Sequence, residues 1–348
     1  MRDRTRTRLL HGTAVLSAAV FLTYAFTHPV KQLGSPEPAV AAPGRPGTSA
    51  VASSHPAAPP TYDLAALRKP AKKYLGVTVE GVPRSLGRLT AFSESIENSP
   101  NLVGYFHPYG DRLDVAGVAA VHATGALPFV QIEPHRDTIA EIAAGKTDDF
   151  LADFAADLRA VDAPVALSFG HEMNGDWYPW GTQDTSAEEF VAAWRHIHKA
   201  FRKAGVTSVL WVWNPNVTYP RPNVDIAELY PGDKYVDWVG VTGYYNTGPG
   251  GRGTFETLFQ PTIAKVRTFT DKPVLIAETG ASPSGEKPTQ IKNLFTAVRA
   301  RRDVVGFVWF NYHKSGKHET NWRIDSDTRS RSTFATQAQH DAFDFRVP

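Results

Sequence analysis

The sequence predicts an α/β protein whose folded part is a (β/α)8 barrel, also called a TIM barrel, and three observations lead to this expectation. Short apolar runs rich in β-branched and aromatic residues recur along the chain. Longer segments with helical periodicity separate them, which is the pattern of repeated βα units around a parallel sheet. Eight such units in about 280 residues fit a barrel of ordinary size. A doubly wound open sheet is the second possibility.

The eight apolar runs are the expected strands. Each is short, and each leaves room for a helix before the next. The runs cover residues 74–79, 102–106, 127–132, 165–169, 209–213, 236–242, 274–277 and 304–310.

Three helices are marked by their ends or by their apolar faces. Residues 147–149 can cap a helix, and Ser186 with Glu189 forms a capping-box pattern for a second helix that Gly205 ends. The segment 334–343 has the pattern of a closing helix. The residues expected to face the core are Phe150, Leu151, Phe154, Leu158, Phe190, Trp194, Ile197, Phe201, Phe334, Ala335, Ala338 and Phe343.

The first part of the chain has the order of an export signal. Four arginines within residues 2–8 precede an apolar run over residues 9–26, and a segment rich in Pro, Ala and Ser follows to about residue 62. We therefore expect a signal peptide or signal anchor over 1–26, a linker over 27–62 and the catalytic barrel over 63–348.

Cleavage of this leader is left open by the sequence. Ala39-Val40-Ala41 resembles a cleavage site but lies thirteen residues beyond Phe26, whereas the apolar run of eighteen residues is at the short end for a membrane span. The arginines favour a cytoplasmic N-terminus. The barrel is thus expected to be secreted or anchored to the outer face of the cytoplasmic membrane.

Composition excludes several classes of function. The 37 basic and 35 acidic side chains give a net charge of +2, which carries no signature of nucleic-acid binding. The absence of cysteine excludes disulfides, thiolate metal sites and a cysteine nucleophile. The sequence has no phosphate-binding glycine loop and no nucleophile elbow, and His171-Glu172 lacks the second histidine of a zinc-protease helix. We expect a monomeric catalytic domain.

Two glutamates stand at the expected ends of strands. Glu172 lies in segment 168–181, which has an imidazole, an amide and, after Glu172, three large aromatic residues behind an apolar run. Glu278 follows the buried-strand pattern of residues 272–277. The carboxyl ends of barrel strands form one catalytic face. Because glycoside hydrolysis needs an acid and, in retaining enzymes, a nucleophilic carboxylate about 5 to 5.5 Å away, the pair predicts glycosidic-bond chemistry.

The run His171-Glu172-Met173-Asn174-Gly175 followed by Trp177 resembles the acid/base motif of glycoside hydrolase family 26, whose members are mostly secreted β-mannanases. The resemblance extends over about residues 74–325. It implies a (β/α)8 barrel, net retention, and no metal or organic cofactor. It also implies that Glu172 is the acid/base and Glu278 the nucleophile.

The same resemblance implies residues that support the reaction and bind the polysaccharide. His171 and Tyr244 are expected to assist the two glutamates, and Trp177 and Trp309 to wall the sugar site. Histidines and aromatic residues near the expected strand ends add further candidates. The expected substrate-binding residues are His135, His171, Trp177, Tyr244, Trp309 and Trp322.

Two residues depart from the family pattern. Ser168 stands where the family usually has an arginine that helps to hold the nucleophile ionised, and Thr242 stands where it often has an aspartate. The loss of both charges fits either a compensated change or an altered substrate. On physical grounds, Glu172 needs an apolar, aromatic surrounding that raises its pKa, whereas Glu278 needs hydrogen-bond donors, of which Tyr244 is a candidate.

The favoured function is a retaining endo-β-glycosidase that hydrolyses a β-linked polysaccharide, above all β-1,4-mannan. One alternative, motivated by Ser168 and Thr242, is a weakly catalytic or non-catalytic barrel that binds glycans of the cell envelope. Another is a transglycosylase, which would use the same carboxylates but transfer the sugar to a hydroxyl instead of water.

Overall fold

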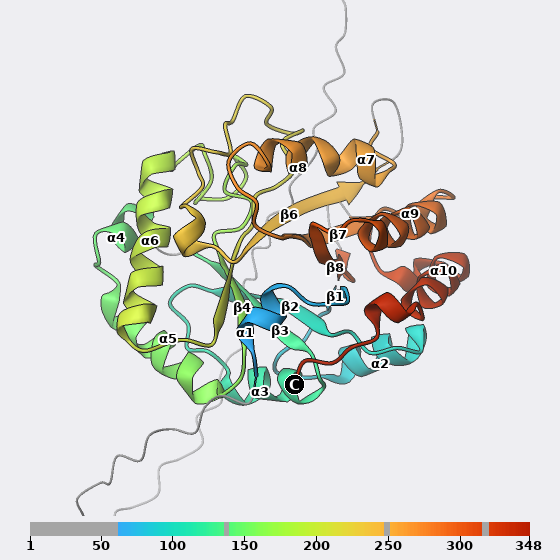
Figure 1. Cartoon of the computed structure of the whole chain (residues 1–348), viewed down its shortest axis with the longest axis horizontal. Coiled ribbons are helices and arrows are strands. Elements are labelled where there is room, and N and C mark those ends of the chain that lie inside the picture. The colour runs from blue at the N-terminus through green and yellow to red at the C-terminus, as the bar shows by residue number, and fades with distance from the viewer. Residues whose placement is uncertain (1–61, 136–138, 247–250, 315–319) are drawn as a thin grey trace, which may run out of the picture.

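The computed structural model describes residues 62–135, 139–246, 251–314 and 320–348. Eight parallel strands follow one another around a closed barrel, and helices surround them (Figure 1). The first strand, β1, pairs with the last, β8, over Tyr74–Thr78, which excludes an open sheet. The expected (β/α)8 barrel is therefore confirmed. The expected leader of residues 1–26 lies outside the described residues, in which no helix is long and apolar enough to cross a membrane.

All eight expected strands are present. They differ from the expectation mainly at β6, which starts later and runs to Tyr245, and at β7, which continues to Ala281. A short hairpin follows the barrel. The strands are β1 (Tyr74–Thr78), β2 (Leu102–Pro108), β3 (Leu127–Glu133), β4 (Val165–Phe169), β5 (Val209–Trp213), β6 (Trp238–Tyr245), β7 (Val274–Ala281), β8 (Val304–Phe310), β9 (His313–Lys314) and β10 (Thr320–Asn321).

Helices occupy the connections between the strands. The longest are α5, α6 and α9, and three short 3-10 turns complete the described part. The elements are α1 (Leu64–Arg68), α2 (Gly87–Ile96), α3 (Val115–Ala123), α4 (Ile139–Ala143), α5 (Asp148–Val161), α6 (Ala187–Lys203), η1 (Asp233–Tyr235), α7 (Phe255–Leu258), α8 (Gln260–Val266), α9 (Lys287–Ala300), η2 (Ile324–Ser326), α10 (Thr328–Ala338) and η3 (Asp341–Phe343).

The three expected helices are α5, α6 and α10. Thr147 is the N-cap of α5 but makes no capping hydrogen bond through its side chain. Ser186 and Glu189 form the expected reciprocal capping box of α6. The closing helix ends at Ala338, so Phe343 reaches the core from a separate 3-10 turn.

Replacing Ser186 with alanine should lower the free energy of unfolding by about 1 kcal/mol, because the capping box is lost. The Ser186 hydroxyl accepts from the Glu189 backbone N–H at 3.2 Å, and the Glu189 carboxylate accepts from the Ser186 N–H at 3.0 Å. Urea unfolding measures the change. Ser332→Ala, an exposed position inside α10, is the control and should change little. Equal effects of the two substitutions would contradict a special role for the cap.

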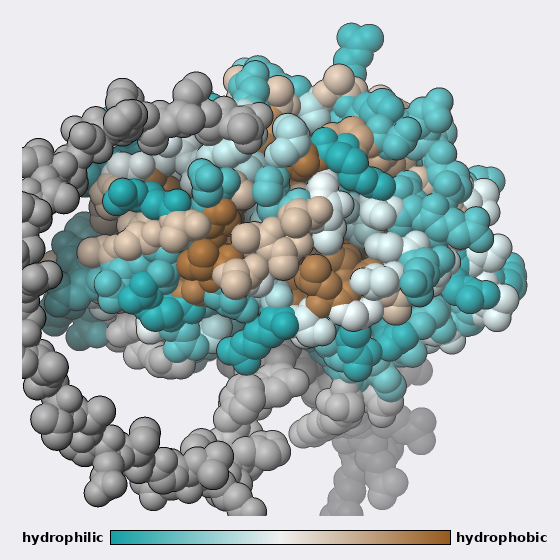
Figure 2. Space-filling view, turned by 90° about the horizontal axis from the view of Figure 1, so that it is seen from below, coloured by the Kyte–Doolittle hydropathy of each residue, from teal (hydrophilic) through white to brown (hydrophobic). Residues whose placement is uncertain are grey.

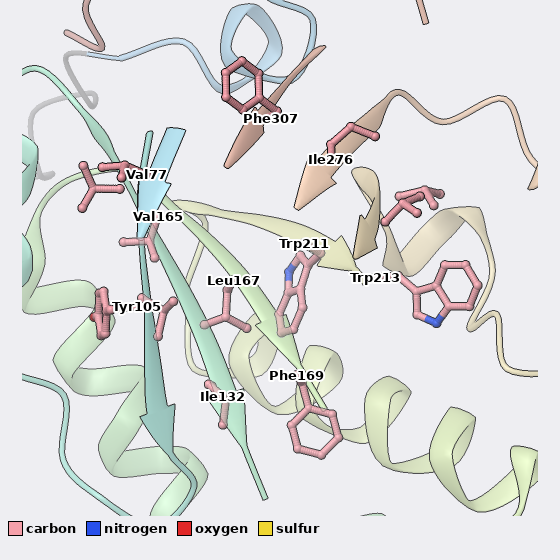
Figure 3. Packing of buried hydrophobic residues seen from close by; sticks show 14 of the residues in the cluster. Val77, Tyr105, Ile132, Val165, Leu167, Phe169, Trp211, Trp213, Ile276 and Phe307 are labelled. Atoms are coloured by element: carbon pink, nitrogen blue, oxygen red, sulfur yellow. The ribbon is translucent and has the colours of Figure 1, made fainter. Parts of the chain in front are cut away.

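The core consists of two clusters on opposite faces of the strands. Side chains that point outward from the barrel, such as Leu167, Phe169, Trp213 and Phe307, pack against the helices (Figure 3). A second cluster that includes Phe129, Leu210 and Val308 fills the barrel interior. On the face seen in Figure 2, hydrophobic residues form small patches among hydrophilic ones. Tyr219, at 38% exposure, is the exposed large hydrophobic residue of the described part.

Candidate active site

The backbone holds Glu172 in an unusual conformation just after β4. Gly170 and Glu172 both have positive φ angles, of 54° and 56°. A left-handed conformation is uncommon for a glutamate and costs about 1 to 3 kcal/mol. The Glu172 N–H donates to the Asn214 carbonyl at 2.7 Å, and the Glu172 carbonyl accepts from the Gly175 N–H at 2.8 Å. These bonds fix Glu172 at the carboxyl end of the barrel.

Both oxygens of the Glu172 carboxylate accept hydrogen bonds. The indole N–H of Trp177 donates to Oε2 at 2.7 Å, and the Asn216 amide donates to Oε1 at 2.6 Å. Asn216 is held in turn by reciprocal bonds with Asn174, of 2.9 and 2.8 Å. The sequence analysis did not select Asn216. Its only signal is the polar Asn214-Pro215-Asn216 run that follows β5.

Glu278 lies within β7, not at the end of the strand as expected. The pairing of β6 with β7 continues beyond it, through Tyr244 opposite Gly280 and Tyr245 opposite Ala281. The register shifts beside Glu278 on both neighbouring strands. Such irregularities re-aim side chains next to active sites. The strand is therefore longer than its apolar pattern, and the shift occurs where the carboxylate is presented.

Glu278 is buried and has few partners. The Tyr244 hydroxyl donates a short hydrogen bond to Oε1, while Oε2 has no partner among the described residues. Burial, followed by the neighbouring charge of Glu172, raises the pKa of Glu278 to about 7. Tyr244 thus supplies the expected donor, but it does not return the pKa to its ordinary value.

His171 and His135 lie with Tyr178 and Trp180 in an aromatic cluster on the β3–β4 side of the mouth. The His171 Nε2 is 3.3 Å from the Tyr178 hydroxyl, and the Trp180 indole N–H donates to the His171 carbonyl at 2.7 Å. Burial lowers the pKa of His171, so its ring is neutral at pH 7. His135 packs edge-on against Trp180 at 4.8 Å, and its Nε2 is 3.4 Å from the Glu133 carboxylate.

Of the expected tryptophans, Trp309 does not lie in the mouth. Trp322 packs against Tyr244, with ring centroids 4.5 Å apart, but Trp309 points outward from β8 and is fully buried against Phe334 at 5.6 Å. Its indole N–H donates to the Trp322 carbonyl at 3.1 Å, so it supports the neighbouring wall instead of forming it. The adjacent Phe310 points toward Tyr244, at 6.0 Å. Trp309 is therefore removed from the candidate sugar contacts.

The two positions that depart from the family pattern are buried and uncharged. Ser168 lies opposite Gln131 in the barrel, and its hydroxyl has no hydrogen-bond partner among the described residues. Thr242 lies opposite Glu278 and donates to the Asn214 side-chain oxygen at 3.2 Å. Neither residue supplies a charge to the site. Neutral side chains therefore stand where the family usually has an arginine and often has an aspartate.

Comparison with known proteins supports the expected family resemblance. Residues 137–295, which contain both glutamates, match the family model described as Glycosyl hydrolase family 26. Endoglucanase H of Acetivibrio thermocellus is 31% identical over 240 residues, covering 66% of this chain and 25% of that protein. The expected resemblance to glycosyl hydrolase family 26 is confirmed over residues 137–295.

A second curated relative and a solved structure are also similar to the chain. Mannan endo-1,4-beta-mannosidase A and B of Caldalkalibacillus mannanilyticus is 25% identical over 52% of this chain and 34% of that protein. The chain thus spans about a quarter to a third of these two curated relatives. The catalytic domain of the family 26 endo-beta-1,4-mannanase of Bacillus sp. JAMB-750 has the same fold, with a TM-score of 0.62 and 18% identity over 80% of this chain and 88% of that chain.

Proposed function

We propose that this family 26 barrel is a retaining endo-β-glycosidase, with Glu172 as acid/base and Glu278 as nucleophile. The observation that carries the proposal is the pair of buried carboxylates at the mouth. Glu172 accepts bonds from Trp177 and Asn216, and Glu278 accepts one from Tyr244. The two donors direct the oxygens of Glu172, as suits an acid that delivers a proton along a fixed direction, and Glu278 keeps a free oxygen for attack. More donors therefore face the acid/base than the nucleophile, which is the reverse of the expected distribution.

The reaction then takes two steps. Protonated Glu172 donates its proton to the glycosidic oxygen while the free Oε2 of Glu278 attacks the anomeric carbon, and the bond to the leaving sugar breaks. A covalent glycosyl ester of Glu278 results. Ionised Glu172 next takes a proton from water, whose oxygen attacks the anomeric carbon and releases Glu278. Two inversions give net retention.

We propose β-1,4-mannan as the preferred polysaccharide. The name of the Caldalkalibacillus relative supports this choice, whereas the endoglucanase name of the Acetivibrio relative keeps a β-glucan as the main competitor. Trp177 and Trp322 are half-buried, and flat aromatic faces of this kind suit the C–H faces of pyranose rings. His135, half-exposed beside Glu133, is the polar contact proposed at the opposite side of the mouth.

The test is the release of reducing sugar from mannan, glucomannan and mixed-linked β-glucan. Wild type should act most rapidly on mannan, and the first products detected by NMR should be β anomers. Equal traces from wild type, Glu172→Ala and Glu278→Ala would instead favour a glycan-binding barrel. Products longer than the starting oligosaccharide would identify a transglycosylase.

Replacing Trp177 with phenylalanine should lower kcat/KM by about 10- to 100-fold, because a hydrogen bond to a charged group contributes about 1.5 to 3 kcal/mol. Phenylalanine retains an aromatic ring beside the sugar but cannot donate to Glu172. Steady-state kinetics on mannan measure the loss, and the melting temperature shows that the barrel remains folded. Unchanged kcat/KM would show that Asn216 alone positions the acid/base.

From the expected signal peptide or signal anchor we propose that the barrel acts outside the cytoplasmic membrane, either secreted or tethered. The basic residues followed by the apolar run of residues 9–26 support this placement. Expression of the full chain followed by fractionation tests it. Activity in the medium with a shortened N-terminus would indicate secretion, and activity in the membrane fraction would indicate tethering. Activity confined to the cytoplasm would contradict both.

A further inference from the structure

A small hairpin beyond the last barrel strand brings a lysine to the mouth. After β8 the chain forms β9 and returns as β10, with Lys314 paired to Thr320 in antiparallel register. The Trp322 N–H then donates to the Tyr312 carbonyl at 2.8 Å, which closes the base of the hairpin. Trp322 in turn packs on Tyr244. Lys314 therefore belongs to a hairpin that packs, through Trp322, on Tyr244, the hydrogen-bond partner of Glu278.

A buried lysine of α9 anchors the returning strand of this hairpin. The Lys287 ammonium, which has no exposure, donates to the carbonyls of Asn321 at 3.3 Å and Arg323 at 2.7 Å. It also donates to the Ser326 hydroxyl at 3.0 Å. Three bonds from one buried cation tie the segment to the barrel. The bonds from Lys287 thus hold the hairpin, and with it Lys314, in place at the mouth.

The Lys314 side chain reaches back over aromatic residues that adjoin the catalytic groups. Its ammonium lies 4.9 Å from the centre of the Phe310 ring, a cation–π distance. Phe310 contacts Tyr244 at 6.0 Å on one side and Phe106 at 6.4 Å on the other, and Phe106 contacts His171 at 5.4 Å. The positive charge of Lys314 lowers the pKa of both Glu278 and His171, as expected for a cation near these two side chains.

Glu278 needs such a cation. No donor to its Oε2 is found in the described part of the chain, and the carboxylates of Glu172 and Glu133 both raise its pKa. A buried carboxylate without compensation is costly to ionise. Ser168, at the position below the acid/base loop, is neutral. Among the described residues, the other charged groups that act on Glu278 are anionic, and the Tyr244 phenol is neutral.

We propose that Lys314 is a positioning residue for the reaction, whose ammonium favours the ionised form of Glu278 and so extends nucleophilic attack to lower pH. The inference rests on the proposed function. In this proposal β4 provides no cation, because it has Ser168 where the family usually has an arginine, and the hairpin beyond β8 provides one instead. Removal of the charge should impair formation of the glycosyl ester at low pH and leave the high-pH rate nearly intact.

The pH profile of kcat/KM tests this proposal. Wild type should lose activity as the pH falls through about 7, the pKa of Glu278, because the nucleophile becomes protonated. Lys314→Met should move this acid limb to higher pH by about one unit, and so lower kcat/KM at pH 6 by about 10-fold. Lys314→Arg should restore the wild-type limb. Lys292→Met removes the same charge from an exposed position on α9 and should change nothing.

A second measurement separates this inference from the proposed function. Carbon-13 NMR of labelled glutamate carboxyls, with Glu278 assigned from Glu278→Gln, follows the Glu278 titration without any substrate. The midpoint should rise in Lys314→Met. Inactivity of wild type on every glycan would overturn the proposed function only. If wild type is active but Lys314→Met leaves both the acid limb of kcat/KM and the midpoint of the Glu278 titration unchanged, the proposed role of Lys314 is wrong. A rise in KM as the sole effect of Lys314→Met would instead identify Lys314 as a sugar contact.

Discussion

Glu278→Ala should reduce kcat on mannan by about 10⁴-fold or more, because removing a nucleophile abolishes the covalent route. Glu172→Ala should cost about 10²- to 10⁴-fold on mannan, the usual contribution of general acid–base catalysis. The two variants differ on an aryl glycoside whose leaving group needs no proton. Glu172→Ala should then form the glycosyl ester rapidly and release it slowly, with a burst of phenol, whereas Glu278→Ala should remain inactive.

Azide gives the control that assigns the roles. In Glu172→Ala, azide can attack the glycosyl ester of Glu278 and yield a β-glycosyl azide, with retention. In Glu278→Ala, azide takes the place of the missing carboxylate and yields an α-glycosyl azide by one inversion. Products of the opposite configurations would reverse the assignment. Glu188→Ala, an exposed glutamate in the first turn of α6, should behave as wild type.

The fold could be predicted because each strand is an apolar run, and the acid/base could be predicted because polar and aromatic residues crowd behind one such run. The continuous apolar character of the strands also prevented a correct prediction for Trp309. Every residue of β8 from Val304 to Phe310 is buried, so its sequence has no alternation that tells inward from outward side chains. Only the structure shows that Phe310 faces Tyr244 while Trp309 faces the helices.

Long-range contacts explain the other residues that sequence reasoning missed. Asn216 reaches Glu172 because β4 and β5 are neighbours in the barrel, and the Asn174 side chain holds it there. Lys314 belongs to a strand of two residues, too short to have a periodic pattern, and reads in sequence as a loop lysine. The register shifts beside Glu278 depend on the pairing of three strands. Apart from the polar run that contains Asn216, these features have no local signal.

Glu278 should also make the barrel less stable at alkaline pH, and Glu278→Gln should relieve this cost. The pKa of Glu278 is raised from 4.5 to about 7 in the folded state. Below about pH 4.5 the carboxyl is protonated in both states and contributes no difference. Between these values the unfolded chain releases the proton while the folded chain retains it. The penalty therefore grows with pH up to about 7 and is constant above it.

Its size follows from the linkage, since each pH unit corresponds to 1.36 kcal/mol. Glu278→Gln should thus raise the free energy of unfolding by about 3 kcal/mol at pH 8 relative to its effect at pH 4.5. Glutamine has the same shape and still accepts from Tyr244, so packing is nearly unchanged. Urea unfolding of both proteins at the two pH values measures the difference, with Glu188→Gln as the exposed control. A constant difference between Glu278→Gln and wild type at both pH values would show that Glu278 titrates normally, and the nucleophile would then be ionised well below pH 7 without help from Lys314.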